Sequence, residues 1–325
     1  MDYIKLKTLD GNDIKISSLG FGCEPLGGTD WGSVDIKSIE KAFYNSIDIG
    51  WNYFDTAAVY GLGASEKNLG NLLSNIKDEL IVSTKVGMMW DDPASLSNKN
   101  NSRLKVKVDS SPKAIRFSIE RSLKYLNLTS IPLVFLHNPD PKVPIEDSIG
   151  ELKKLVLEGK IRAIGVSNFL SDEIQKASSE CLISAVQMER NSLDILDGRK
   201  SIETVRICKK LEIPIFGYGT LARGILTGKY GKDIPIFENN DRRHRLEIFQ
   251  KENYSKIWKV LSKWTIISDR LNVPMSALSI RMALDMLDVD VAIVGIKSTK
   301  QLTINSESLG WKISEKMSRE LLKHV

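Results

Sequence analysis

The segment Leu133-Val134-Phe135-Leu136-His137 is a short apolar run with the length of a buried strand, and Ile145 to Glu158 after it repeats apolar residues at the spacing of an amphipathic helix. The same unit, an apolar run followed by a longer helical pattern, recurs along the chain. It predicts eight strands, at Leu19 to Gly22, Tyr53 to Asp55, Leu80 to Lys85, Leu133 to His137, Ala163 to Ser167, Ala185 to Met188, Pro214 to Tyr218 and Val291 to Val294.

The helical patterns lie between these runs. Alternation of strand and helix indicates a parallel sheet of the α/β class, either an open sheet or a closed barrel, and eight strands favour a (β/α)8 TIM barrel. An open dinucleotide-binding sheet would carry G-x-G-x-x-G in its first turn, and neither Gly20 to Pro25 nor Gly61 to Glu66 completes that pattern. The helices are predicted at Asp35 to Ile49, Ser65 to Leu73, Pro112 to Leu126, Ile145 to Glu158, Ser171 to Ser178, Arg199 to Leu211 and Met275 to Met286.

The N-terminal segment alternates apolar and polar residues around Asp10-Gly11-Asn12. This pattern predicts a β-hairpin, from Tyr3 to Leu9 and from Asp13 to Ile16, that caps a larger unit. A chain of 325 residues is within the range of α/β barrels that form one domain. We therefore expect a single barrel domain over residues 1–325.

The composition excludes several classes of protein. The chain has 42% hydrophobic and 27% charged residues, and no apolar run approaches the roughly 20 residues that cross a bilayer. The segment Met1 to Leu9 lacks the apolar centre of a signal peptide, so we expect a soluble, cytoplasmic protein that does not bind membranes. The net charge of +5 is spread along the chain, which argues against nucleic-acid binding and suits an anionic ligand.

The three cysteines (Cys23, Cys181 and Cys208) form no CxxC pair, and the three histidines are equally scattered. The spacing predicts reduced thiols, no structural zinc site and no catalytic metal.

Two polar stretches interrupt the alternation, Met88 to Ser110 and Tyr230 to Glu252. Each follows a predicted strand, the third and the seventh, so each is expected at the barrel face where active sites form. We interpret them as loops that contact substrate and cofactor.

Polar residues end three successive predicted strands, with a tyrosine nearby. Asp55, Lys85 and His137 close the second, third and fourth runs, and Tyr60 follows in the loop after Asp55. Taken singly, Asp55 could be a loop cap, Tyr60 a packing aromatic and His137 a core histidine. A lysine that ends a buried strand needs a partner, and Asp55 on the neighbouring strand could be that partner. The four residues together predict a catalytic site at the carboxyl end of the barrel.

These four residues suit proton donation to an oxygen that is becoming negative. Tyr60 could be the general acid, and a nearby Lys85 ammonium would stabilise its phenolate and lower its pKa from the reference value of about 10. Asp55 would hold Lys85 charged and oriented, and His137 would hydrogen-bond a carbonyl oxygen. None of the four supplies reducing power, so a nicotinamide cofactor is expected to provide hydride.

Several motifs carry a family resemblance that spans about Leu19 to Leu309. The segment Phe54-Asp55-Thr56-Ala57-Ala58-Val59-Tyr60-Gly61, with Ser65-Glu66 and Leu69-Gly70, resembles the first signature of the aldo-keto reductases. Further motifs follow in that family's order, at Ser83-Thr84-Lys85, Leu136-His137-Asn138-Pro139-Asp140, Gly159-Lys160-Ile161-Arg162 and Gly165-Val166-Ser167-Asn168.

The resemblance implies that Asp55, Tyr60, Lys85 and His137 are the family's catalytic tetrad, in agreement with the roles inferred from the residues themselves. Ser167, Asn168 and Gln187 match positions that hold the nicotinamide carboxamide. Tyr218 matches the aromatic that stacks on the nicotinamide ring, with a core aromatic as the alternative. The further cofactor contacts that the resemblance implies are Gly22, Cys23, Asp55, Gly219, Leu221, Arg223, Lys229, Gly295, Lys297, Ser298, Gln301 and Asn305.

The cofactor expected from this resemblance is NADPH. Lys297 and the Ser298 hydroxyl could hold a phosphate on the adenosine ribose by charge-assisted hydrogen bonds, although a solvated Lys297 is the alternative. The chain departs from the family at Gly219-Thr220, where Ser-Pro is usual, and at Ile304, where a glutamate often contacts adenine.

Two other functions fit parts of the sequence. One branch of the superfamily consists of cytoplasmic β-subunits of potassium channels that bind NADPH as a regulatory ligand, but that branch usually has Asn in place of His137. A barrel enzyme without nicotinamide, such as a phosphosugar isomerase, would explain the strand count and leave Tyr218, Lys297 and the tetrad unexplained. We therefore expect a reductase of a small-molecule carbonyl compound, either monomeric or homo-oligomeric.

The substrate is expected to be sugar-like. Glu24, Trp31 and Trp90 are placed near the mouth of the barrel, where a carboxylate and two aromatic faces would suit a hydroxylated molecule. A scaffold role for the two tryptophans is the alternative.

Overall fold

A computed structural model of the chain describes residues 1–76, 79–90, 106–197 and 201–324. Eight parallel strands form a closed barrel in the order β10-β11-β12-β3-β4-β5-β8-β9, which confirms the expected (β/α)8 architecture. The strands are β3 (Leu19–Gly22), β4 (Tyr53–Asp55), β5 (Ile81–Val86), β8 (Ile131–Leu136), β9 (Ile161–Ser167), β10 (Ala185–Glu189), β11 (Ile215–Tyr218) and β12 (Val291–Gly295).

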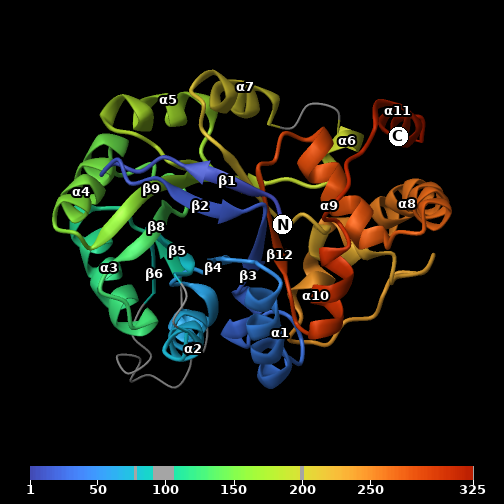
Figure 1. Cartoon of the computed structure of the whole chain (residues 1–325), viewed down its shortest axis with the longest axis horizontal. Coiled ribbons are helices and arrows are strands. Elements are labelled where there is room, and N and C mark those ends of the chain that lie inside the picture. The colour runs from blue at the N-terminus through green and yellow to red at the C-terminus, as the bar shows by residue number, and fades with distance from the viewer. Residues whose placement is uncertain (77–78, 91–105, 198–200, 325) are drawn as a thin grey trace.

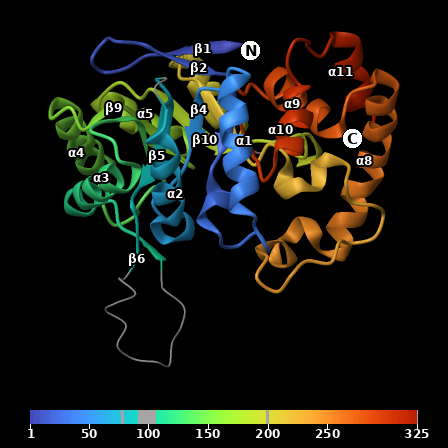
Figure 2. The ribbon, with the colours of Figure 1, turned by 60° about the horizontal axis from the view of Figure 1, so that its bottom comes forward.

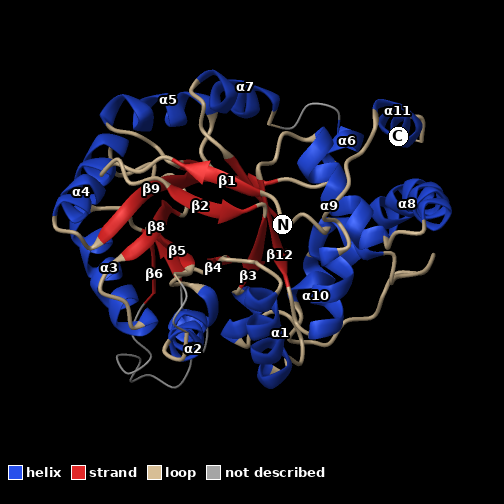
Figure 3. Cartoon of the chain, in the orientation of Figure 1, coloured by secondary structure: helices blue, strands red, loops and turns tan. Residues whose placement is uncertain are grey.

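Helices surround the strands as an outer layer (Figure 3). Those that the periodicity predicted are α1 (Ile36–Asp48), α2 (Ala64–Leu73), α3 (Pro112–Leu126), α4 (Ile145–Leu157), α5 (Ser171–Glu180), α7 (Ile202–Lys210) and α9 (Met275–Met286). Local chemistry explains their starts. For example, the Asp35 carboxylate accepts hydrogen bonds from the backbone N–H groups of Lys37 and Ser38, and Ser111 caps α3 ahead of Pro112.

The predicted N-terminal hairpin is present as β1 (Tyr3–Leu6) paired antiparallel with β2 (Ile14–Ser17). It lies across one end of the barrel (Figure 1), where Leu6, Ile14 and Ile16 pack with side chains of the barrel interior such as Phe135 and Phe216. The hairpin therefore closes the amino end of the barrel. The carboxyl end is not covered by the hairpin and can form a binding site.

The two polar stretches have structure of their own. The ends of the first pair as β6 (Met88–Trp90) and β7 (Val106–Val108), while residues 91–105 lie outside the described part. Figure 2 shows β6 on the side of the molecule opposite the hairpin. The second contains the short helical turns η5 (Arg242–Arg245) and η6 (Glu247–Phe249), and it leads into the long helix α8 (Lys251–Leu271).

Four further helices were not among those that the periodicity predicted, namely α6 (Asp194–Asp197), α8, α10 (Thr299–Ser306) and α11 (Glu315–Leu322). α8 packs on α9 and shares a second apolar cluster with the loop after β11. Within the ranges that the structure describes, no helix is both long and apolar enough to cross a membrane.

Candidate active site at the carboxyl end of the barrel

The four predicted catalytic residues lie at the carboxyl ends of adjacent strands. Asp55 is the last residue of β4, Lys85 is near the end of β5, and His137 follows β8 directly. Tyr60 begins the helical turn η2 (Tyr60–Gly63) after β4. Because parallel strands end on one face of a barrel, the fold brings side chains from three separate segments to one place.

Lys85 and Asp55 form a buried ion pair. The Lys85 Nζ atom lies 2.7 Å from Asp55 Oδ2, and the two side chains are only 1% and 5% exposed. Lys85 also donates to the carbonyl oxygen of Thr56 at 2.8 Å. The other carboxylate oxygen of Asp55 accepts hydrogen bonds from Ser83 and Gln187, each at 2.8 Å. These bonds compensate the loss of hydration and fix the position of the ammonium group.

The Tyr60 ring lies between Lys85 and His137. The Lys85 Nζ atom is 5.0 Å from the centroid of the Tyr60 ring, and the Tyr60 and His137 rings meet edge to face with centroids 6.1 Å apart. Burial, together with the charge of Lys85, lowers the pKa of His137 to about 3. The imidazole is therefore neutral at physiological pH, and its Nδ1 has no hydrogen-bond partner among the described residues.

The pKa of Tyr60 does not move in the direction that the sequence suggested. Burial raises it well above its ordinary value of 10.0, and the negative charges of Glu24 and Asp55 raise it further. The Lys85 ammonium, whose hydrogen bonds go to Asp55 and to the Thr56 carbonyl, does not offset these effects. The phenol is consequently protonated across the physiological range, which is the form that a proton donor requires.

A cavity of about 490 Å³ opens beside these residues. Asp55 and Tyr60 form part of its wall, together with the loops after β3, β11 and β12. Of the residues predicted to bind cofactor or substrate, those that line it are Gly22, Glu24, Trp31, Asp55, Tyr218, Gly219, Leu221, Arg223, Lys229, Gly295, Lys297, Ser298, Gln301 and Asn305.

Three predicted residues lie behind the wall and support it. Asn168 donates to Asn138 Oδ1 and to the backbone carbonyl of His137, and its own Oδ1 accepts from the Tyr218 hydroxyl at 2.8 Å. Gln187 is bonded to Asp55, and the buried Ser167 hydroxyl has no partner among the described residues.

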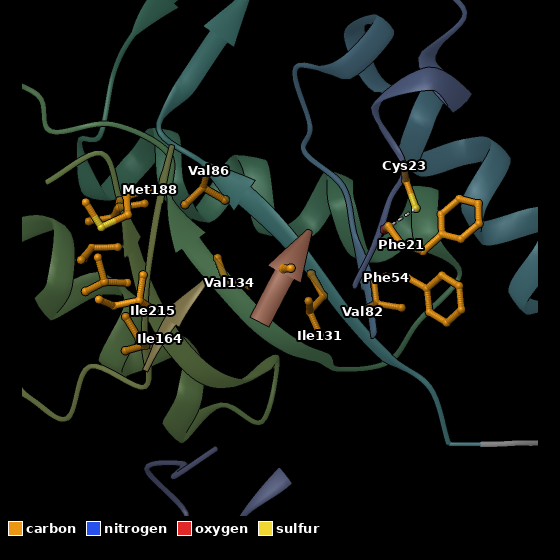
Figure 4. Packing of buried hydrophobic residues seen from close by; sticks show 14 of the residues in the cluster. Phe21, Cys23, Phe54, Val82, Val86, Ile131, Val134, Ile164, Met188 and Ile215 are labelled. Carbon is orange, nitrogen blue, oxygen red and sulfur yellow. Dashed lines mark hydrogen bonds between the residues drawn. The ribbon is translucent and has the colours of Figure 1, made fainter. Parts of the chain in front are cut away.

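Lys85 and His137 are not among the residues that line the cavity, and two other predicted residues, Cys23 and Trp90, lie away from the site. Cys23 is fully buried, and its thiol lies beside Phe21 and Phe54 in the core (Figure 4), with a contact of 3.5 Å to the Phe21 carbonyl oxygen. Trp90 stacks against Arg121 of α3 at 3.9 Å, away from the cavity-lining residues. Cys23 is a packing residue because it faces the surrounding helices, and Trp90 is placed elsewhere because β6 folds back onto β7 and α3.

Cationic side chains gather at the end of the cavity near β12. Lys229, Lys297 and Arg243 all line it, and burial together with the neighbouring cations lowers the pKa values of both lysines. Lys297 donates to the backbone carbonyl of Trp31 at 2.7 Å. Arg243 was not among the predicted site residues, and the signal for it was the basic run 242–245 inside the polar stretch. A group of cations held this close favours an anionic ligand.

The loops after β3 and β11 meet over this end of the cavity. Trp31 pairs with Asp241 through an isolated β-bridge, and the Trp31 ring lies 4.5 Å from the Arg242 guanidinium. Trp31, which was expected to contact substrate, lines the cavity and also contacts Arg243 and Lys297. The Trp31 ring N–H is buried and has no partner among the described residues.

The residues present fit a nicotinamide dinucleotide. Cations for phosphate groups line one end of the cavity, the Tyr218 ring lines it as a surface for stacking, and the buried Trp31 ring N–H has no partner among the described residues. Over the described ranges, no cluster of three His, Cys, Asp or Glu side chains could hold a metal ion.

Comparisons with known proteins find similarity over nearly the whole chain. The model of the aldo/keto reductase family matches residues 18–325. The aldo-keto reductase yakc of Schizosaccharomyces pombe, whose name specifies NADP+, is 30% identical over 313 residues, which are 96% of this chain and 88% of that protein. The NADH-specific methylglyoxal reductase of Escherichia coli is 28% identical, with 94% of each chain covered.

A solved structure shows the same architecture. The glycerol dehydrogenase of Gluconobacter oxydans superposes with a TM-score of 0.85 at 30% identity, over 99% of this chain and 96% of that one. The agreement therefore extends over nearly the whole of both chains.

Proposed function

This chain belongs to the aldo/keto reductase family of carbonyl-reducing oxidoreductases, and from that premise we propose that it reduces an aldehyde, a ketone or a keto-sugar to an alcohol with NADPH, with Tyr60 as the general acid. The observation that carries the proposal is the position of Tyr60 in the cavity wall, in contact with both Lys85 and His137.

Each residue of the site has a role in this reaction. A reduced nicotinamide, when bound, supplies hydride to the carbonyl carbon. Tyr60 donates its hydroxyl proton to the carbonyl oxygen, and the neutral His137 hydrogen-bonds that oxygen and polarises it. Lys85, held by Asp55, offsets the negative charge left on the Tyr60 oxygen after the proton has moved. Solvent then returns a proton to Tyr60.

The raised pKa of Tyr60 is compatible with this role. The phenol stays protonated until negative charge develops on the carbonyl oxygen, so it does not lose its proton before the substrate reacts. As charge develops on the phenol oxygen, the nearby ammonium of Lys85 favours the transfer.

The cations at the far end of the cavity favour NADPH over NADH. Lys297 and Ser298, at the start of α10, together with Arg243, supply charge and hydrogen-bond donors for a phosphate on the adenosine ribose. Relatives of this chain use both cofactors, since the yeast relative is named for NADP+ and the bacterial methylglyoxal reductase for NADH. The preference therefore depends on these particular side chains.

The test is NADPH oxidation by the purified protein with a panel of aldehydes, ketones and keto-sugars, in parallel with Tyr60→Phe. The variant is expected to bind NADPH like the wild type and to turn over about 10²- to 10⁴-fold more slowly. Tyr44→Phe, which removes a hydroxyl from α1 outside the site, is the matched control and should retain wild-type turnover. Unchanged turnover in Tyr60→Phe would overturn the assignment of the general acid, and NADPH binding without turnover on the whole panel would favour a regulatory binding subunit.

A further inference from the structure

The cavity has two ends of different electrostatic character. Lys229 and Lys297 form no ion pair with any carboxylate in the described part of the chain, and although Asp241 acts on both from a distance, the end near β12 keeps an excess of positive charge. Two arginines nearer Tyr60 are each paired with a carboxylate, Arg223 with Glu189 and Arg242 with Glu24, and Arg242 also borders the cationic end through its contact with Trp31. The first end suits phosphate groups, while the second has no spare charge to attract an ion.

The matched pair nearest to Tyr60 is Glu24 with Arg242. The Arg242 Nη1 atom lies 3.0 Å from Glu24 Oε1, and Nη2 lies 3.3 Å from Oε2, so the pair is bidentate. Glu24 follows β3 and lines the cavity, whereas Arg242 comes from η5, which is distant in the sequence, and is not itself among the lining residues. The charge of Glu24 acts on both Tyr60 and Tyr218, and it raises the pKa of each. The carboxylate therefore stands beside the place where the carbonyl must lie.

A second pair has the same arrangement on the other side of Tyr218. The Arg223 Nη2 atom lies 3.4 Å from Glu189 Oε1, and its guanidinium lies 5.8 Å from the centroid of the Tyr218 ring. Arg223 is thus also neutralised by a carboxylate. An anionic substrate would find no free cation at this end.

The Glu24–Arg242 pair keeps hydrogen-bonding capacity after pairing. A carboxylate has about four lone-pair sites, and the bidentate contact leaves some of them free. Arg242 has five N–H donors, and its two contacts with Glu24 use only one on each Nη atom, so further donors remain on a side chain that is 34% exposed. A paired acceptor and donor of this kind bind vicinal hydroxyl groups, each of which both donates and accepts.

We propose that the Glu24–Arg242 pair is the specificity determinant of this enzyme and selects an uncharged, polyhydroxylated carbonyl compound, such as an open-chain hydroxyaldehyde or hydroxyketone. The assignment rests on the proposed reductase function, because it presupposes a carbonyl held beside Tyr60. Glu24 accepts hydrogen bonds from the substrate hydroxyls, and Arg242 orients Glu24 and donates to a neighbouring hydroxyl oxygen.

The experiment compares matched aldehydes that differ only in their hydroxyl groups. We would measure kcat/KM with NADPH for glyceraldehyde against propanal and for erythrose against butanal, in the wild type and in Glu24→Gln. The ratio within each pair cancels any effect of Glu24 on Tyr60, because both aldehydes react through the same proton donor. Glu146→Gln, which removes an exposed carboxylate from α4, is the control, and NADPH binding by each variant checks its fold.

The wild type should prefer the hydroxylated aldehyde of each pair, and Glu24→Gln should lose about 10- to 100-fold of that preference, as expected for hydrogen bonds to a charged group. Glu146→Gln should keep the wild-type ratio. An unchanged ratio in Glu24→Gln, or no preference in the wild type, would overturn this assignment and leave the reductase function intact. Turnover of none of the four aldehydes would overturn the reductase function itself, and a stronger preference for glyceraldehyde 3-phosphate would overturn the uncharged substrate.

Discussion

Lys85 is the residue on which the geometry of the site depends most. It is nearly inaccessible to solvent, and its ammonium reaches both Asp55 and the Thr56 carbonyl at hydrogen-bond distance. A buried charge is stable only with such partners, so the two side chains support each other. The same contacts hold the ammonium near the Tyr60 ring. The ion pair therefore contributes both to the stability of the fold and to the position of the proposed proton donor's neighbour.

Removing one partner of this pair should cost more than removing both. Lys85→Met leaves the Asp55 carboxylate buried without a counter-charge, and we expect it to lower the free energy of unfolding by about 3 to 5 kcal/mol. The double variant Lys85→Met/Asp55→Asn should recover a substantial part of that loss. Urea denaturation measures both, with Lys5→Met, from the exposed Lys5–Asp13 pair, as a control that changes stability by less than about 1 kcal/mol. A double variant less stable than Lys85→Met would contradict the uncompensated charge as the cause.

Lys297 should control the choice between the two nicotinamide cofactors. Lys297→Met removes a cation that suits the ribose phosphate of NADPH, so the Kd for NADPH should rise about 10- to 100-fold while the Kd for NADH changes little. Titration of protein fluorescence with each cofactor measures both constants. Lys312→Met, at an exposed site, serves as the control. An equal increase in the Kd values for NADPH and NADH would show that Lys297 does not bind the phosphate on the adenosine ribose.

At the scale of elements, the helical turns η1 (Glu24–Gly27) and η2 carry the site, and they touch each other backbone to backbone. Gly61, directly after Tyr60, has a φ of +58°, and a Cβ there would lie 2.2 Å from the Gly27 carbonyl oxygen. Only glycine fits at this contact. The contact fixes the loop that presents Tyr60 relative to the loop that presents Glu24.

Gly61→Ala should therefore damage both stability and activity. Gly28, in the same loop pair, has a φ of +70°, but a Cβ there would meet only open space, so Gly28→Ala reports the cost of backbone strain alone. We expect Gly28→Ala to cost about 1 to 2 kcal/mol and Gly61→Ala to cost clearly more, with a lower kcat because Tyr60 is displaced. Thermal unfolding and steady-state kinetics measure the two effects. Equal losses in the two variants would show that the close contact with Gly27 is unimportant.

The sequence predicted the elements whose patterns are local. All eight barrel strands were identified because each apolar run fills both faces of a parallel sheet, and the hairpin was identified from its turn residues. α8 was missed because its start lies inside a polar, charged stretch that was interpreted as a loop. Asp55, Lys85 and His137 were identifiable because strand ends mark the active face of a barrel.

Contacts between distant loops could not be predicted in this way. Arg242 is 218 residues from Glu24, and Lys297 is 266 residues from the Trp31 carbonyl that it binds. The predicted direction of the Tyr60 pKa shift was wrong because the sequence did not reveal how deeply the phenol is buried or that Glu24 lies close enough to raise its pKa further.

At the scale of the whole molecule, the two ends of the barrel have separate tasks. The hairpin and the apolar barrel interior close one end, while the other end buries an ion pair, a neutral histidine and a group of cations. Burying these groups costs free energy, which the extended apolar packing of the barrel and its helices offsets. Stability should therefore depend on the protonation of the site.

Acid should destabilise the protein partly through His137. Its pKa is about 3 in the folded protein and near 6.5 when exposed, so between these values the unfolded chain binds the extra proton. The contribution to stability is complete above about pH 6.5 and is lost toward pH 3, by up to about 1.4 kcal/mol per pH unit. Urea denaturation between pH 7 and pH 4 should show a smaller loss in His137→Asn than in the wild type. The same loss in both proteins would contradict a buried neutral imidazole.

The central claim is that this chain passes hydride from NADPH to a carbonyl carbon. It is tested most directly by incubating the purified protein with glyceraldehyde or propanal and NADPH that carries deuterium at both positions of nicotinamide C4, followed by mass spectrometry of the alcohol. We expect an alcohol one deuterium heavier than the unlabelled product, formed at a rate that falls with Tyr60→Phe. Bound NADPH with no alcohol, or an alcohol without deuterium, would contradict it.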